Sequence, residues 1–176
     1  MRDRPPETLA GTLERAVRAR QSERLPSVAA AVVRRGETVW SGAVGVASYE
    51  DERDATPDTQ YRVGSITKTF TATAVMQLRD AGLLDLDDRI DEHISELPKG
   101  SPTIRRLLAH LSGFQREPGE MWVTGEVPTI EDILAAVATY ELVLPAARAH
   151  HYSNLAYGLL GELVARRGGM PYARWK

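Results

Sequence analysis

The chain has 176 residues, of which 43% are hydrophobic and 26% are charged, and its formal net charge at pH 7 is -2. These values are typical of a folded protein in water and give no bulk attraction for nucleic acid, and no apolar run approaches the roughly 20 residues that span a bilayer. Because the chain contains no cysteine, disulfide bonds, thiolate metal sites and cysteine nucleophiles are excluded.

The N-terminal part is predicted to form a helix followed by a β-hairpin. Apolar residues recur at helical spacing from Pro5 to about Gln21. Residues 27–47 then change to two β-like runs around a turn at 34–37, and the apolar first run predicts a strand buried on both faces. A charged surface loop is expected over 48–60. Residues 1–60 are therefore expected to supply a helix and two sheet strands.

From residue 61 onward the pattern favours helices. We expect them at about 65–81, 90–96, 102–111, 129–140 and 153–167, and a further helix beginning at Pro171. Two strands do not make a stable sheet core by themselves. We therefore expect an α/β (α+β) fold in which 1–60 and the helical region 61–176 form one incomplete domain of a larger protein.

A serine and a lysine lie three residues apart where the first of these later helices is expected to begin. This spacing brings Ser65 and Lys68 to one helix face. A serine hydroxyl becomes a good nucleophile when a base takes its proton, and a lysine can serve where apolar surroundings lower its pKa. Val63, Ile66 and Phe70 predict such surroundings. The alternative is a helix-capping serine followed by a solvated lysine.

The second motif contains the only asparagine of the chain. Asn154 lies two residues after Tyr152, and roughly 0.03 such pairs are expected by chance. A tyrosine phenol near a lysine could exchange protons with the serine, while the amide could hold both the lysine and a substrate carbonyl. The alternative is a helix cap followed by packing of a half-buried aromatic ring.

Together the two motifs resemble those of serine β-lactamase-related hydrolases, namely class C β-lactamases, D-alanyl-D-alanine carboxypeptidases and related esterases. The resemblance runs from about Val28 to Trp175 and includes YRVGSITKTFTATAVMQLRDAGLLDLDDRI, IRRLLAHLSGF and YSNLAYGLLGELV. It implies a β-lactamase/transpeptidase-like fold from which the C-terminal sheet strands are absent. One departure is that residues 145–147 read Pro-Ala-Ala where the family commonly has Pro-Gly.

The resemblance also implies roles for individual residues. Ser65 would be the acylated nucleophile, Lys68 its base partner, Tyr152 the proton-transfer group and Asn154 the anchor of the substrate and the lysine. The backbone N–H of Ser65 would form half of an oxyanion hole. In the family, the other half and a third motif come from a strand near the C-terminus that this chain lacks.

The expected function is a serine hydrolase that acts through an acyl-enzyme on an ester, a β-lactam or a D-amino-acid peptide amide. The alternative is a truncated, catalytically incompetent relative, or one half of a split protein that a C-terminal segment complements. The expected partner is a small-molecule or peptide-like substrate.

No cofactor and no metal are expected, since His150 and His151 lack an H-x-x-x-H partner. His110 in LLAHLSGF is interpreted as structural, near the C-terminal end of a helix dipole. The stretch from Asp85 to Glu96 echoes a calcium loop, but it lacks a ligand and a glycine at two required positions. With no apolar signal segment at the N-terminus, we expect a cytoplasmic protein unless a leader has been removed.

Overall fold

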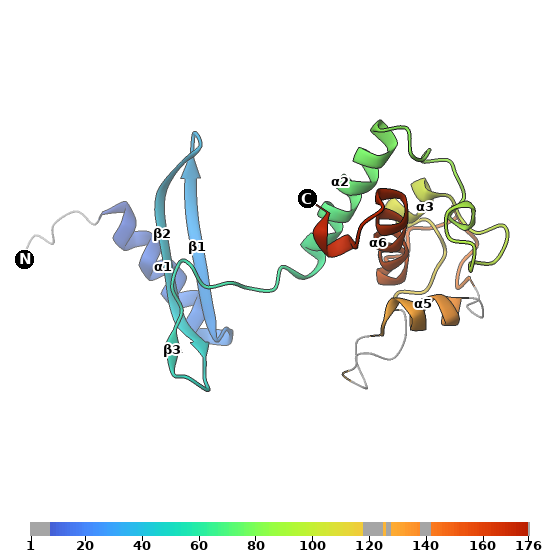
Figure 1. Cartoon of the computed structure of the whole chain (residues 1–176). Helices are drawn as coiled ribbons and strands as arrows, with labels where there is room; N and C mark the ends of the chain where they lie inside the picture. The colour runs from blue at the N-terminus through green and yellow to red at the C-terminus, as the bar shows by residue number, and fades with distance from the viewer. Residues whose placement is uncertain (1–7, 118–124, 126–127, 138–141, 176) are drawn as a thin grey trace, which may run out of the picture. The chain divides into compact units, whose positions relative to one another are not determined.

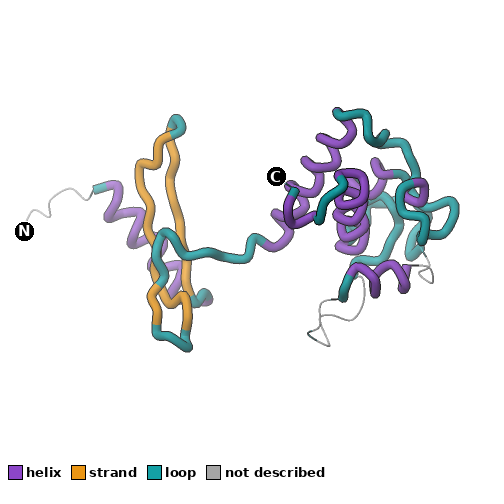
Figure 2. Tube along the Cα trace, in the orientation of Figure 1, coloured by secondary structure: helices purple, strands orange, loops and turns teal. Residues whose placement is uncertain are grey.

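The computed structural model describes residues 8–117, 125, 128–137 and 142–175. The chain divides into two units, Met1–Arg62 and Val63–Lys176. Among the described residues, all three strands lie in the first unit, whereas the second unit consists of helices and loops (Figure 2). Within those ranges no helix combines the length and the apolarity needed to cross a membrane.

The first unit contains one helix and a small antiparallel sheet (Figure 1). Helix α1 (Leu9–Arg24) begins after Thr8, whose hydroxyl accepts a hydrogen bond from the Gly11 N–H at 3.2 Å. Strands β1 (Ser27–Arg34) and β2 (Glu37–Ser48) form the expected hairpin. Its two turn residues, Arg35 and Gly36, have φ angles of 54° and 84°, as tight hairpin turns require.

Two expectations for this unit are wrong. A third strand, β3 (Arg53–Asp54), pairs with β2 inside the segment expected to be a loop, giving the strand order β1-β2-β3. Strand β1 is not buried on both faces, because every one of its residues is at least partly exposed. Helix α1 packs against the hairpin, and in the described part of this unit no other helix covers the sheet. An apolar strand composition therefore predicts a tendency to be buried, and the neighbouring elements decide whether it is.

The second unit is built around two helices that pack side by side, α2 (Thr67–Asp80) and α6 (Asn154–Gly168) (Figure 1). The shorter helices α3 (Ile104–Leu108) and α5 (Ile130–Val137) contact α6. Apolar residues spaced three or four apart place one face of each long helix in the core, and burying each large side chain stabilises the fold by about 1.5–3 kcal/mol. Fully or almost fully buried are Val75, Leu78, Leu107, Leu155, Leu159, Leu160 and Leu163.

Several helix ends follow the expected signals. Ser153 caps α6 at its start, and Gly169, with φ of 67°, ends it. Thr103 caps the start of α3, and the Thr103 hydroxyl accepts a hydrogen bond from the Arg106 N–H. Residues 138–140, the end of the helix expected over 129–140, lie outside the described residues.

The helix expected over 90–96 is only a short turn, η2 (Ile90–Glu92). The start of this turn is joined to a distant segment: the Ile90 N–H donates to Pro102 O at 3.1 Å, and the Ile104 N–H donates to Asp88 O at 3.0 Å. The helix expected at Pro171 is likewise only a turn, η3 (Tyr172–Arg174).

Candidate active site

Ser65 lies in the short turn η1 (Gly64–Ile66), which leads directly into α2. Gly64 has φ of 53° at this point. Lys68 follows on the first turn of α2, and its Nζ lies 3.4 Å from Ser65 Oγ. Ser65 is exposed and Lys68 is half-buried. The local chain path therefore places the amine within reach of the hydroxyl.

The segment from His151 to Asn154 is held by the loop that follows α3. The His151 N–H donates to His110 O at 2.8 Å, and the Asn154 N–H donates to Arg116 O at 2.7 Å. Ser153 is fully buried, and its hydroxyl donates to Gln115 O at 2.7 Å while accepting from the Ala156 N–H. This network fixes the backbone from which the two motif side chains project.

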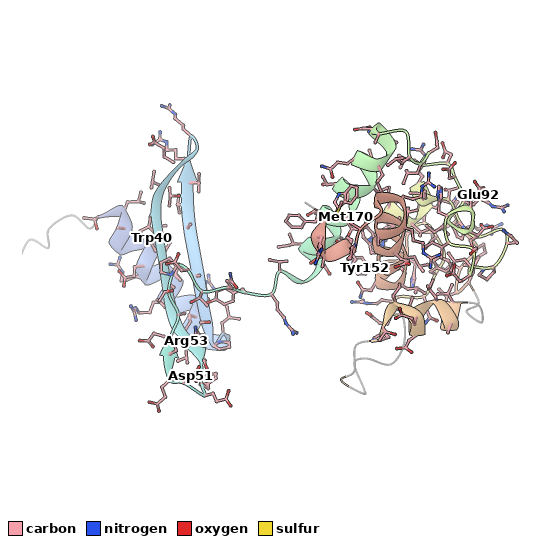
Figure 3. All side chains as sticks on the ribbon, viewed as in Figure 1. Trp40, Asp51, Arg53, Glu92, Tyr152 and Met170 are labelled. Atoms are coloured by element: carbon pink, nitrogen blue, oxygen red, sulfur yellow. The ribbon has the colours of Figure 1, made fainter. Side chains whose placement is uncertain are left out.

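Packing of α2 against α6 brings the four predicted residues together. Tyr152 Oη donates to Ser65 Oγ at 2.7 Å, and Lys68 Nζ donates to Asn154 Oδ1 at 2.6 Å. Lys68 Nζ also lies 4.8 Å from the centre of the Tyr152 ring. Tyr152, just before α6, is labelled in Figure 3. The hydroxyl, amine, phenol and amide thus form one continuous hydrogen-bonded group.

The neighbours of Tyr152 stabilise its phenolate form more than water does for an ordinary tyrosine. The Lys68 ammonium and, next, the Ser65 hydroxyl lower the pKa of Tyr152 below its ordinary value, because both stabilise the phenolate. Burial acts in the opposite direction, and Arg116 adds a smaller lowering effect. Tyr152 therefore loses its proton at a lower pH than an ordinary tyrosine.

The surroundings of Lys68 differ from those expected. Val63, Ile66 and Phe70 are 52%, 59% and 65% exposed, so they do not enclose the amine within their unit. Phe70, two residues after Lys68 in α2, lies on the opposite side of that helix. The rings that approach Lys68 instead come from the α6 side: Tyr152, and Tyr157 at 5.6 Å from Nζ to the ring centre.

His110 contacts the candidate site, which sequence reasoning did not anticipate. Its ring centre lies 4.5 Å from that of Tyr152 and 5.0 Å from that of Tyr157. Its Nδ1 accepts from the Ser153 N–H at 3.1 Å. Burial first, and then the nearby His150 and Lys68, lower the pKa of His110, so the neutral ring is favoured. His110 therefore contacts Tyr152 directly from the loop that follows α3.

Glu117 is a second residue that sequence reasoning missed. Both of its carboxylate oxygens accept from Asn154 Nδ2, each at 2.9 Å. The two residues are 37 positions apart and Glu117 belongs to no recognised motif, so the sequence offered no signal for this contact.

A groove of about 830 Å³ adjoins the site, and its lining includes Lys68, Asn154, Ile133, Tyr157 and Tyr172. Its volume is within the range of small-molecule pockets. Among the described residues, no group of three or more His, Cys, Asp or Glu side chains is arranged to hold a metal ion.

Comparison with known proteins identifies relatives in sequence and in structure. Beta-lactamase-like protein 2 of Dictyostelium discoideum is 34% identical over 164 residues, which cover 86% of this chain and 30% of that protein. The octameric penicillin-binding protein homologue of Pyrococcus abyssi is 30% identical, with a TM-score of 0.80 and coverage of 94% of this chain and 40% of that one. The D-amino acid amidase of Ochrobactrum anthropi is 27% identical, with a TM-score of 0.76 and coverage of 90% and 46%.

The chain thus spans less than half the length of each of these relatives. The structural similarity confirms the expected β-lactamase/transpeptidase-like fold. A family model described as Beta-lactamase matches residues 13–175, which is most of the chain and contains both motifs. The resemblance inferred from the two motifs is therefore confirmed, and the chain belongs to the Beta-lactamase family.

Proposed function

We propose that this chain carries the acylation machinery of a serine hydrolase, with Ser65 as the nucleophile. The observation that carries the proposal is that Ser65 Oγ lies 2.7 Å from Tyr152 Oη and 3.4 Å from Lys68 Nζ. A nucleophile within reach of two groups that exchange protons is the usual arrangement for covalent catalysis. Membership of the Beta-lactamase family supports the same reaction class.

In the proposed reaction, Ser65 Oγ bonds to a substrate carbonyl carbon while its proton passes to the Tyr152 phenolate or to a neutral Lys68 amine. The tetrahedral intermediate then collapses, the bond to the leaving group breaks, and the leaving group takes up that proton. This leaves an acyl group on Ser65. Water adds to the acyl carbon by the same route in reverse, which releases the acid and restores the hydroxyl.

We propose a carbonyl substrate of small-molecule or peptide-like size, namely an ester, a β-lactam or a D-amino-acid peptide amide. The similarity to a D-amino acid amidase supports an amide, and the family supports a β-lactam. All three classes share the acyl carbon that the reaction requires. Asn154 would hold the lysine and the substrate, and the Ser65 N–H would donate to the developing oxyanion.

The proposal is tested by intact-protein mass spectrometry after incubation with benzylpenicillin, with p-nitrophenyl acetate and with a fluorophosphonate probe. We expect a covalent adduct on the wild-type chain and none on Ser65→Ala. Equal labelling of both proteins would overturn the assignment of the nucleophile.

A second candidate function for these 176 residues is acylation without turnover. The same mass measurement, repeated over time after removing excess probe, separates the two. Return of the unmodified mass indicates hydrolysis, whereas a persistent penicillin or acetyl adduct indicates acylation alone. If adding a separate C-terminal segment of a longer relative accelerates release, the chain is one half of a complementing pair.

A further inference from the structure

We propose that Glu117 is a positioning residue, whose carboxylate orients the Asn154 amide so that its oxygen faces Lys68. The inference deepens the proposed function and rests on it for its catalytic consequence. The orientation of the Asn154 amide by Glu117 is inferred from the hydrogen bonds alone and does not depend on the proposed function. Lys68 Nζ donates to Asn154 Oδ1 at 2.6 Å, and Asn154 Nδ2 donates to both carboxylate oxygens of Glu117 at 2.9 Å.

An asparagine amide has two ends of nearly equal size, so its orientation depends on its neighbours. An ammonium group has only donors, whereas a carboxylate has only acceptors. Lys68 therefore selects the oxygen of Asn154, and Glu117 selects the nitrogen. The two charged neighbours lie on opposite ends of one amide and select the same orientation. Rotating this amide by 180° would break both charge-assisted contacts.

The environment of Glu117 distinguishes this contact from an ordinary surface ion pair. The Glu117 side chain is only 16% exposed. It also forms an ion pair at 3.2 Å with Arg116, and the Arg116 side chain is 66% exposed. An ion pair with so exposed a partner contributes little. The contact with Asn154 is made by both carboxylate oxygens in a half-buried position, where hydrogen bonds to a charged group contribute more.

The catalytic consequence follows from the chain of contacts that ends at the nucleophile. Lys68 has to lie close to Ser65 to take part in proton transfer, and its distance from Oγ is 3.4 Å. The Asn154 oxygen holds the lysine from α6, and Glu117 holds the asparagine from the loop after α3. Without the carboxylate, only Lys68 still selects the orientation of the amide, so Asn154 is held at one end instead of two. Asn154 would then hold Lys68 less firmly beside Ser65.

The structural part can be tested directly, because Asn154 is the only asparagine. Labelling with ¹⁵N-asparagine gives one pair of side-chain amide signals in a proton–nitrogen correlation spectrum, which need no further assignment. In Glu117→Ala we expect these signals to shift and their protons to exchange with water faster than in wild type. In Glu117→Gln, whose amide oxygen can still accept from Asn154 Nδ2, we expect slower exchange than in Glu117→Ala.

Glu92→Gln is the matched control, because Glu92 is an exposed residue of η2 that pairs only weakly with Arg89, at 3.7 Å (Figure 3). It should leave the asparagine signals unchanged. If the asparagine signals of Glu117→Ala and their exchange rates equal those of wild type, the proposal is overturned. Circular dichroism of each variant establishes that it is folded, and the near-isosteric Glu117→Gln keeps the comparison available if the alanine variant does not fold.

The catalytic part is measured as the rate of Ser65 labelling by the fluorophosphonate probe. We expect Glu117→Ala to slow labelling on the order of 10- to 100-fold, as displacement of a reacting group does. Glu117→Gln should recover part of this loss, and Glu92→Gln should match wild type. An unchanged rate in Glu117→Ala would overturn the positioning role. If wild type itself fails to label, the proposed function is wrong, and the asparagine spectrum still decides whether Glu117 orients the amide.

Discussion

Lys68 and Asn154, 86 positions apart in the chain, are joined by a 2.6 Å hydrogen bond from Nζ to Oδ1. The bond links α2 to the first residue of α6, the two helices that form the core of the second unit. It therefore couples the arrangement of the candidate site to the packing of that core. Changes at the ends of either helix should affect both stability and reactivity.

Replacing Tyr152 with phenylalanine should slow acylation of Ser65 by about 10²- to 10⁴-fold, because it removes the group that exchanges the proton. The pH dependence carries a further test. If the phenolate is the base, the labelling rate rises with pH through the pKa of Tyr152. That pKa is lowered, so the midpoint lies below the ordinary 10.0. Fluorophosphonate labelling rates between pH 5 and 10 measure both the loss of rate and its pH dependence. If Tyr152→Phe retains the rise of the labelling rate with pH, Tyr152 is not the base.

Replacing Ser153 with alanine should destabilise the second unit. The fully buried hydroxyl both caps α6 and donates to Gln115 O, so its loss leaves a helix N–H and a carbonyl without their partner. The expected cost is about 1–3 kcal/mol. Urea unfolding followed by circular dichroism measures it. Ser95→Ala, at an exposed serine, is the control and should cost less than about 0.5 kcal/mol; equal costs would contradict the buried network.

Gly113→Ala should be more destabilising than Gly82→Ala. Both glycines have positive φ, 79° and 70°, so an alanine is strained at either position. At Gly113, however, an added Cβ would also approach the Leu144 carbonyl oxygen to within 2.1 Å, whereas at Gly82 it would meet nothing within 4 Å. The strain alone costs about 1 kcal/mol. Thermal melts of the two variants compare the sites, and equal losses would show that the backbone of Leu144 moves away freely.

Stability should fall as the pH drops below about 6.5, the ordinary pKa of histidine. Burial, His150 and Lys68 hold the pKa of folded His110 lower than this, so between the two values the unfolded chain binds a proton that the folded chain does not. The stability contributed by neutral His110 is complete above the unfolded pKa and is lost as the pH falls through the folded one. His110→Asn, which can still accept from the Ser153 N–H but does not titrate, should lose less.

Urea unfolding of wild type and His110→Asn at pH 5 and pH 8 checks this difference. A similar pH dependence in the two proteins would assign the effect to other groups.

Local features were predictable because neighbouring residues produce them. Once the segment is helical, the three-residue spacing of Ser65 and Lys68 brings both to one face whatever the rest of the chain does. Ser153 and Gly169 bound α6 for equally local reasons, a side-chain cap and a left-handed backbone. The pair Arg35 and Gly36 similarly gives the hairpin turn.

Other features depended on elements that are distant in sequence. The segment 90–96 has helical composition, but it forms only a short turn, and the N–H of its first residue pairs with the distant Pro102. Strand β1 has the composition of a buried strand, yet its neighbours within its unit leave it partly exposed.

The sequence by itself was enough to identify the family, to predict the helical character of the described part of 61–176 and to name the four candidate side chains of the site. Only the tertiary structure decided that Glu117 and His110 join them, since packing of α6 against α2 and of the 110–117 loop against α6 brings these side chains into contact. The physical reason is that spacing along a helix is a property of one segment. A hydrogen bond or a ring contact across 37 or 42 positions depends on how separate segments fold against each other.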